Sequence, residues 1–154
     1  SISEGNEYSR RVEDLAKTLE AYTLNISVSI EQELSEISDE IELKEFLLEM
    51  GMNSTGLEKV IQTGYRLLGL CTYFTTGPKE TRAWTIANST VAPEAAGKIH
   101  TDFKKGFIRA ETVSYSDFIS TGGWLRAKEL GKARSEGKDY VVKDGDIMNF
   151  LFSP

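Results

Sequence analysis

Basic and aromatic side chains crowd into residues 98–109, the part of the sequence whose chemistry points most clearly to a ligand. A single acid, Asp102, opposes the basic side chains there, and Phe103 and Phe107 are interleaved with them. The basic side chains are Lys98, His100, Lys104, Lys105 and Arg109. Cations neutralise phosphates and aromatic rings stack on unpaired bases, so this composition suits contact with RNA.

The same segment has a plainer interpretation, which the sequence leaves open. Phenylalanine is more often a core residue than a ligand contact, and we expect Phe107 to be buried. The lysines would then be ordinary surface residues. His100 has Asp102 as its only nearby carboxylate, which favours a surface or helix-capping histidine over a catalytic one.

Sequence motifs for catalysis are absent from the chain. It has no Gly-x-x-x-x-Gly-Lys-Ser/Thr loop to hold nucleotide phosphates and no Gly-x-Ser-x-Gly turn to present a nucleophile. Cys71 lies in an apolar, β-rich run, which favours a buried structural thiol. One histidine and one cysteine cannot build an all-His/Cys zinc site. The sequence therefore predicts no catalytic residue and no metal ligand in this chain.

The two halves of the sequence differ in net charge. The 154 residues carry a net charge of −6, but residues 1–66 carry −8 and residues 67–154 carry +2. A single cysteine excludes an internal disulfide and favours a reducing compartment. No apolar run approaches the ~20 residues of a membrane span, and the N-terminus lacks the pattern of a signal peptide. We therefore expect a cytoplasmic protein with no membrane partner.

The first half shows helical periodicity, with one exception. Residues 24–30 alternate apolar and polar side chains, which predicts a strand. Ser38 is the expected N-cap of one helix, Gly51 is its expected end, and Thr55-Gly56-Leu57-Glu58 forms a capping box before another. Helices are predicted over residues 8–22, 39–50 and 55–68.

The second half changes to period two after Gly69. Helices are predicted from Pro93 toward His100 and over residues 124–134. Alternation places Phe107, Arg109 and Glu111 on one side of their strand. Strands are predicted over residues 70–75, 81–86, 107–113, 140–142 and 147–152. Strands mixed with helices in this order predict an α+β fold.

Four ungapped segments of this half resemble the C-terminal domain of the YchF family, the Obg-like ATPases. They span residues 73–86, 92–103, 105–111 and 137–148. The resemblance implies that residues 70–154 form a TGS domain, a ubiquitin-like β-grasp module. It also implies that residues 1–69 are the mainly helical C-terminal remnant of a P-loop nucleotide-binding domain.

The resemblance continues upstream through two short elements of base recognition. Ser27, Val28 and Ser29 resemble the family's Ser-Ala-Lys-type loop over the nucleotide base, although Ser29 stands where lysine is common. Glu4 resembles the end of the family's Asn-x-x-Glu motif, with Ser1 in place of the asparagine. These four residues, Ser27, Val28, Ser29 and Glu4, are the expected base-binding set.

The resemblance implies a parent protein that hydrolyses ATP or GTP with Mg²⁺, using a phosphate loop and metal ligands that would precede Ser1. This chain alone is then expected to be inactive and to retain no cofactor. Its TGS domain would bind the ribosome or RNA. Two alternatives stay open because one fold hosts many roles: a protein–protein interaction module, and an intramolecular regulator of the nucleotide-binding domain.

Overall fold

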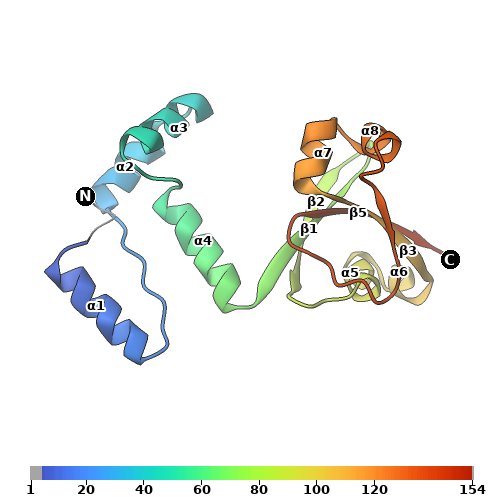
Figure 1. Cartoon of the computed structure of the whole chain (residues 1–154), viewed down its shortest axis with the longest axis horizontal. Coiled ribbons are helices and arrows are strands. Elements are labelled where there is room, and N and C mark those ends of the chain that lie inside the picture. The colour runs from blue at the N-terminus through green and yellow to red at the C-terminus, as the bar shows by residue number, and fades with distance from the viewer. Residues whose placement is uncertain (1–4, 154) are drawn as a thin grey trace. The chain divides into compact units, whose positions relative to one another are not determined.

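The computed structural model describes residues 5–153, which divide into two compact units (Figure 1). The first unit ends at Leu67 and the second begins at Leu68. Separate clusters of buried hydrophobic residues lie in the helical part and in the part that contains the sheet. Each unit is therefore described by itself.

The first unit is helical. Its elements are α1 (Glu7–Thr18), α2 (Val28–Glu36), α3 (Glu40–Glu49) and α4 (Gly56–Leu67). Its buried cluster is small: Ile30 and Leu34 of α2 meet Leu47 of α3. Three partly buried side chains pack against that cluster, namely Leu43, Phe46 and Met52.

A side-chain cap marks where α3 begins, and a glycine marks where it ends. Asp39, one residue after the predicted Ser38, caps α3 by accepting from the backbone N–H groups of Ile41 (2.8 Å) and Glu42 (3.0 Å). These hydrogen bonds favour the charged carboxylate and lower the pKa of Asp39. Gly51 follows α3 with φ +67°, as expected for a helix stop.

The capping box of α4 is also confirmed. The backbone N–H of Thr55 donates to Glu58 Oε2 (3.0 Å), and that of Glu58 donates to Thr55 Oγ1 (3.1 Å). These reciprocal bonds satisfy two donors that would lack partners at the start of the helix.

The strand predicted over residues 24–30 is wrong. Residues 21–27 belong to no helix or strand, and α2 begins at Val28. A strand requires a partner strand, and among the described residues no strand pairs with this segment. Ile30 and Leu34 instead lie four residues apart and bury against Leu47, which favours the helix.

The second unit contains a five-stranded mixed sheet, and the α+β fold class is confirmed at this level. The strand order is β2-β1-β5-β3-β4, with β1 and β5 parallel and the other neighbours antiparallel. The strands are β1 (Leu70–Thr76), β2 (Thr81–Ala87), β3 (Phe107–Ser114), β4 (Arg134–Glu136) and β5 (Asp146–Phe152). The predicted hairpin of β1 and β2 is present, with register from Leu70–Ala87 to Thr76–Thr81.

Two predictions in this unit are wrong. Residues 140–142 form no strand and contribute only an isolated bridge between Val91 and Val141, whereas Arg134–Glu136 pairs with β3 as β4. The helix predicted over residues 124–134 ends at Glu129. Gly131 follows with φ +69°, a left-handed conformation that stops a helix and that glycine adopts without strain.

Helices α5 (Ala92–Ile99) and α6 (Thr101–Lys105) pack against the core side of the sheet, and α7 (Tyr115–Thr121) and α8 (Trp124–Glu129) lie toward its other side (Figure 1). Three alanines of α5 are fully buried, which lets the helix approach the strands closely. They join a core cluster that includes Cys71, Tyr73, Ile86, Phe107, Ala110, Val142, Met148 and Phe150.

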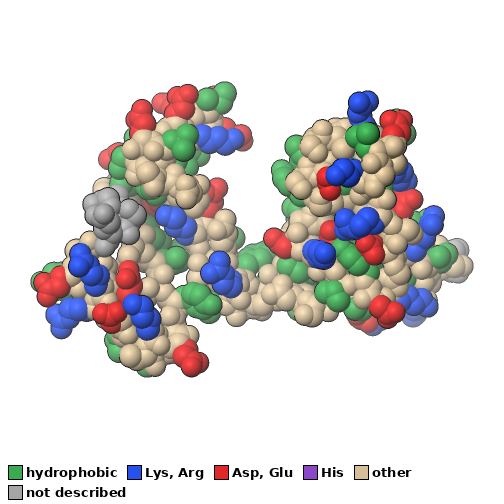
Figure 2. Space-filling view, viewed as in Figure 1, with side chains coloured by type: hydrophobic (Ala, Val, Ile, Leu, Met, Phe, Trp, Pro, Cys, Tyr) green, Lys and Arg blue, Asp and Glu red, His purple; other side chains and the backbone are tan. Residues whose placement is uncertain are grey.

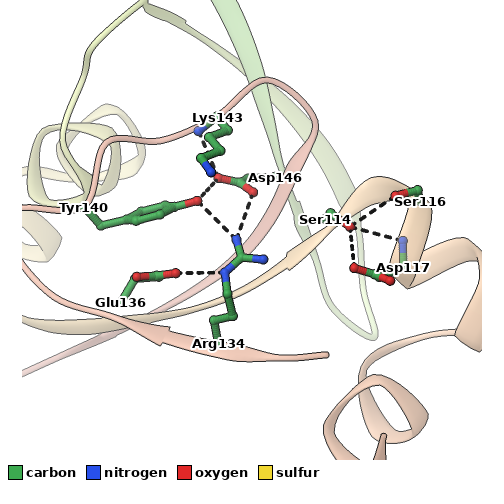
Figure 3. A network of polar contacts seen from close by, with 8 residues as sticks. All are labelled: Ser114, Ser116, Asp117, Arg134, Glu136, Tyr140, Lys143 and Asp146. Carbon is green, nitrogen blue, oxygen red and sulfur yellow. Dashed lines mark hydrogen bonds and ion pairs between the residues drawn. The ribbon is translucent and has the colours of Figure 1, made fainter. Parts of the chain in front are cut away.

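A buried carboxylate holds the last loop to the sheet (Figure 3). Asp146, 3% exposed, accepts from Tyr140 Oη (2.7 Å) and from the backbone N–H of Lys143 (2.9 Å). Arg134 Nη2 lies 3.6 Å from the same carboxylate, and Arg134 Nε donates to Glu136 (2.9 Å). Burial and then Asp146 raise the pKa of Tyr140 to about 12, which keeps its hydroxyl a donor.

Candidate functional site

The basic segment forms the turn between α5 and α6. Pro93 occupies the first turn of α5, as predicted, because its fixed φ suits that position. His100 ends α5 and caps α6: its Nδ1 accepts from the backbone N–H of Asp102 at 3.2 Å. The prediction of a capping histidine is confirmed. The Asp102 carboxylate lies 3.4 Å from the same nitrogen, and that ion pair requires a proton there, so the cap and the ion pair are alternatives.

Lys98, Lys104 and Lys105 are all exposed beside this turn. Lys104 pairs with Glu94 at 2.7 Å, and both side chains are about half exposed. Exposed ion pairs of this kind contribute little free energy, so Lys104 stays available to a ligand. Within residues 5–153, Lys98 and Lys105 form no ion pair. We name the set Lys98, His100, Lys104 and Lys105 the α5–α6 corner.

Arg109 does not join the α5–α6 corner. The pairing of β3 with β5 shifts between Phe107 and Arg109, which inserts Ile108 as an extra residue. Phe107 is consequently buried beside Ala110, as expected for a core residue, while Arg109 lies opposite Leu151 and is exposed on the other face. The predicted sharing of one side by Phe107, Arg109 and Glu111 is wrong because of this bulge.

A further cation, Arg82, lies beside Trp84 on the core side of the sheet. It was not predicted from the sequence as part of a site. The Arg82 guanidinium lies 4.2 Å from the centre of the Trp84 ring, and the Trp84 indole N–H donates to Thr75 Oγ1 at 2.9 Å. The spacing of Arg82 and Trp84 could have indicated that their side chains lie together, since alternate residues of a strand share a face. Trp84 also borders a cavity of about 270 Å³.

Of the expected base-binding set, Ser27 alone borders a cavity in the first unit, of about 340 Å³. Val28 and Ser29 belong to the first turn of α2, outside that lining, and Glu4 lies outside the described residues. The lining comprises Thr23, Leu24, Asn25, Ile26, Ser27, Ile30, Glu31, Gly51, Met52, Asn53, Gly56 and Lys59. This cavity offers polar groups beside apolar ones, as a base requires.

One wall of the first-unit cavity depends on a glycine. Glu31 Oε1 accepts from the backbone N–H of Gly56 at 2.7 Å, linking α2 to the start of α4. A Cβ on Gly56 would lie 2.7 Å from that oxygen and 2.9 Å from Ile26. A residue with a Cβ at position 56 would therefore have to displace the Glu31 carboxylate and Ile26.

Two other predictions concern metal ligands and the thiol. Within residues 5–153, no three His, Cys, Asp or Glu side chains gather as possible metal ligands. Cys71 is buried, and burial, followed by Asp144 and Asp146, raises the pKa of its thiol. A raised pKa is opposite to what a nucleophile needs, and the prediction of a buried thiol is confirmed.

In the described part of the chain, no helix has the length and apolar character of a membrane span.

A family model described as YchF-GTPase_C, protein of unknown function (DUF933), matches residues 70–153. The match covers more than half of the chain, which therefore belongs to the YchF family and contains its C-terminal domain.

Curated relatives extend the similarity upstream. The chain is 53% identical over 150 residues to the ribosome-binding ATPase YchF of Escherichia coli O157:H7, covering 97% of this chain and 41% of the relative. It is 48% identical over 149 residues to the protein of that name from Bacillus subtilis (strain 168), covering 97% and 40%. The chain thus spans about two fifths of the length of these relatives and corresponds to a C-terminal part of YchF.

Solved structures show the same fold. The Schizosaccharomyces pombe YchF GTPase matches with a TM-score of 0.77 and 34% identity, covering 97% of this chain and 40% of that one. A GTP-binding protein from Pyrococcus horikoshii OT3 matches with a TM-score of 0.65 at 19% identity, which shows the fold alone.

Proposed function

We propose that the second unit is a TGS domain of β-grasp fold that binds the ribosome through RNA at the α5–α6 corner. The strand order β2-β1-β5-β3-β4, with parallel β1 and β5 and a helix on the core side, supports the fold assignment. The observation that carries the binding proposal is the gathering of exposed cations at one turn, two of them without an ion pair among the described residues. The ribosome-binding name of the relatives supports the partner.

The first unit is proposed to be the C-terminal remnant of a P-loop domain. The apolar stripe of α1, Tyr8, Val12 and Leu15, is more than half exposed, and Figure 2 shows hydrophobic side chains at the surface of this unit. An amphipathic helix normally buries such a stripe. The alternating residues 24–27 lie outside any helix or strand and pair with no strand among the described residues, which also suits an element that a larger sheet would complete.

The whole protein is then proposed to hydrolyse ATP or GTP with Mg²⁺ in the cytoplasm. The cavity at Ser27 would contribute to the base site, with Val28, Ser29 and Glu4 proposed around it. Phosphates and metal would be held by residues outside this chain, because no phosphate-binding loop occurs in its sequence.

Charge reversal tests the α5–α6 corner. The triple variant Lys98→Glu, Lys104→Glu and Lys105→Glu of the full-length protein is expected to lose at least tenfold in ribosome affinity, because each lysine contacting phosphate releases counterions on binding. Co-sedimentation with ribosomes at several salt concentrations measures this loss, and the salt dependence should become shallower.

The matched control moves the same charge elsewhere on the second unit. Arg126, Lys138 and Lys143 are exposed and form no ion pair within residues 5–153, and their reversal to glutamate should leave the affinity within about twofold. Equal losses in both triple variants would mean that net charge, rather than the α5–α6 corner, governs binding.

Nucleotide titration tests the proposal that tight nucleotide binding depends on residues outside this chain. Isothermal titration of the 154-residue chain with ATP or GTP and Mg²⁺ is expected to show no tight binding, because phosphates supply most of the contacts in this class of protein. The full-length protein is the positive control. Sub-micromolar binding by the chain alone would contradict the proposal.

Protein binding is the second candidate function. Strand β2 lies at the edge of the sheet, where another strand can add, and Ile119 and Leu125 of α7 and α8 are exposed. A partner held by such surfaces would be far less sensitive to salt than RNA held by lysines. The salt series described above therefore distinguishes the two.

A further inference from the structure

We propose that the cavity beside Trp84 receives one unpaired RNA base, while phosphates of the same strand lie on the α5–α6 corner and on Arg82. The inference deepens the proposed RNA contact and rests on it. It concerns how the RNA is recognised: as a single strand with an exposed base, rather than as a charged surface.

The walls of this cavity suit a planar, largely apolar group. The cavity is lined from the sheet by Trp84 of β2 and Phe150 of β5, and from the helices by Ile99 of α5 and Phe103 of α6. Its shape therefore depends on the packing of the helices against the sheet. Its volume of about 270 Å³ lies just below the usual range for drug-sized ligands, which suits a single ring system. Aromatic side chains are the usual platforms for unpaired bases, because every base has a π-face.

Polar groups line the cavity at the end of β1. Strand β1 pairs with β5 in register at Phe74 and Ile147, and the next residues, Thr75 and Thr76, line the cavity opposite the β5 segment 148–150. The Thr75 hydroxyl already accepts from the Trp84 indole, which fixes the ring. Threonine groups at this end can meet the polar edge of a base whose face lies on the aromatic wall.

Charge favours a neutral base inside the cavity and phosphates outside it. Glu80 lines the cavity and would repel an anion that entered. Outside, Arg82 lies over Trp84 on one flank, and Ile99 and Phe103 are sequence neighbours of the α5–α6 corner on the other. Glu94 and Asp102 oppose that corner locally, and even with Glu80 the flanking lysines and Arg82 outnumber the acids.

The decisive comparison uses the unaltered 154-residue chain and two fluorescent probes. One probe is a short oligouridylate, and the other is an abasic oligonucleotide of the same length and phosphate number. Base stacking on an aromatic platform is expected to make the oligouridylate bind about tenfold more tightly in fluorescence anisotropy titrations. Equal affinities would overturn the base pocket, and the ribosome assay on the lysine variants would still test the corner separately.

Two variants then locate the base. Trp84→Leu is expected to weaken oligouridylate binding about tenfold and to leave abasic binding unchanged, whereas Trp84→Phe keeps a ring and should stay within about threefold of the parent chain. Because Trp84 packs on Tyr73, folding of Trp84→Leu must be checked by circular dichroism.

Arg82 is exposed, so a substitution there tests the binding site without removing a residue of the core. Arg82→Glu should weaken oligouridylate binding severalfold, and Arg126→Glu, exposed on α8, should not. Equal effects of these two reversals would overturn the placement of the strand beside Trp84.

Discussion

Replacing Tyr73 with alanine is expected to cost the second unit about 3–5 kcal/mol of unfolding free energy, the range for removing a large buried aromatic side chain. Tyr73 is fully buried, its ring lies 6.4 Å from that of Trp84 and 5.8 Å from that of Phe150, and its hydroxyl donates to the Ala95 carbonyl at 2.8 Å. The substitution therefore leaves a cavity and releases α5 from β1.

Urea unfolding followed by tryptophan fluorescence measures this loss cleanly. Trp84 and Trp124 are the two tryptophans of the sequence, and both belong to the second unit, so the first unit is silent in this signal. Tyr73→Phe is the matched control and should cost only about 1 kcal/mol, the hydroxyl hydrogen bond. A Tyr73→Ala loss no greater than that of Tyr73→Phe would mean that the ring contacts do not stabilise the unit.

Replacing Asp146 with alanine is expected to destabilise the second unit by about 3 kcal/mol. The change removes the buried acceptor of two partly buried donors, the Tyr140 hydroxyl and the Lys143 N–H, and also the carboxylate beside Arg134; a buried donor left unsatisfied costs ~1–3 kcal/mol. The same tryptophan signal reports the unfolding midpoint.

A carboxylate in the same loop provides the control for Asp146. Asp139 is exposed, and within residues 5–153 it makes no hydrogen bond or ion pair, so Asp139→Ala should change the unfolding free energy by less than about 0.5 kcal/mol. Similar losses at the two positions would show that the loop charge, and not the buried network, matters.

Local signals were strong enough to predict several elements. The hairpin of β1 and β2, the capping box at Thr55 and the stop at Gly51 all follow from residues close together in sequence, and each is confirmed. The polar network around Asp146 was not foreseen, although Arg134 and Tyr140 lie close to it in sequence, because Arg134 and Asp146 are brought together only when β4 and β5 both pair with β3.

The errors have a common physical cause. The alternation at residues 24–30 and the β-prone run Tyr140-Val141-Val142 both suit a strand, but pairing also depends on neighbours that the local pattern does not contain. The short β4 pairs with β3 although its three residues carry little signal of their own. In the candidate site, the α5–α6 corner follows from adjacency in sequence, whereas the position of Arg109 depends on a bulge that strict alternation does not predict.

The extra residue at Ile108 has a consequence for how this surface can be engineered. It places Arg109 on the face of the sheet away from the core, apart from the lysines of the α5–α6 corner. Because Arg109 lies on the other face of the sheet, and no ion pair joins it to the α5–α6 corner within residues 5–153, we expect substitutions at the two places to act as independent increments whose free energies sum. One place can then be redesigned without altering the other.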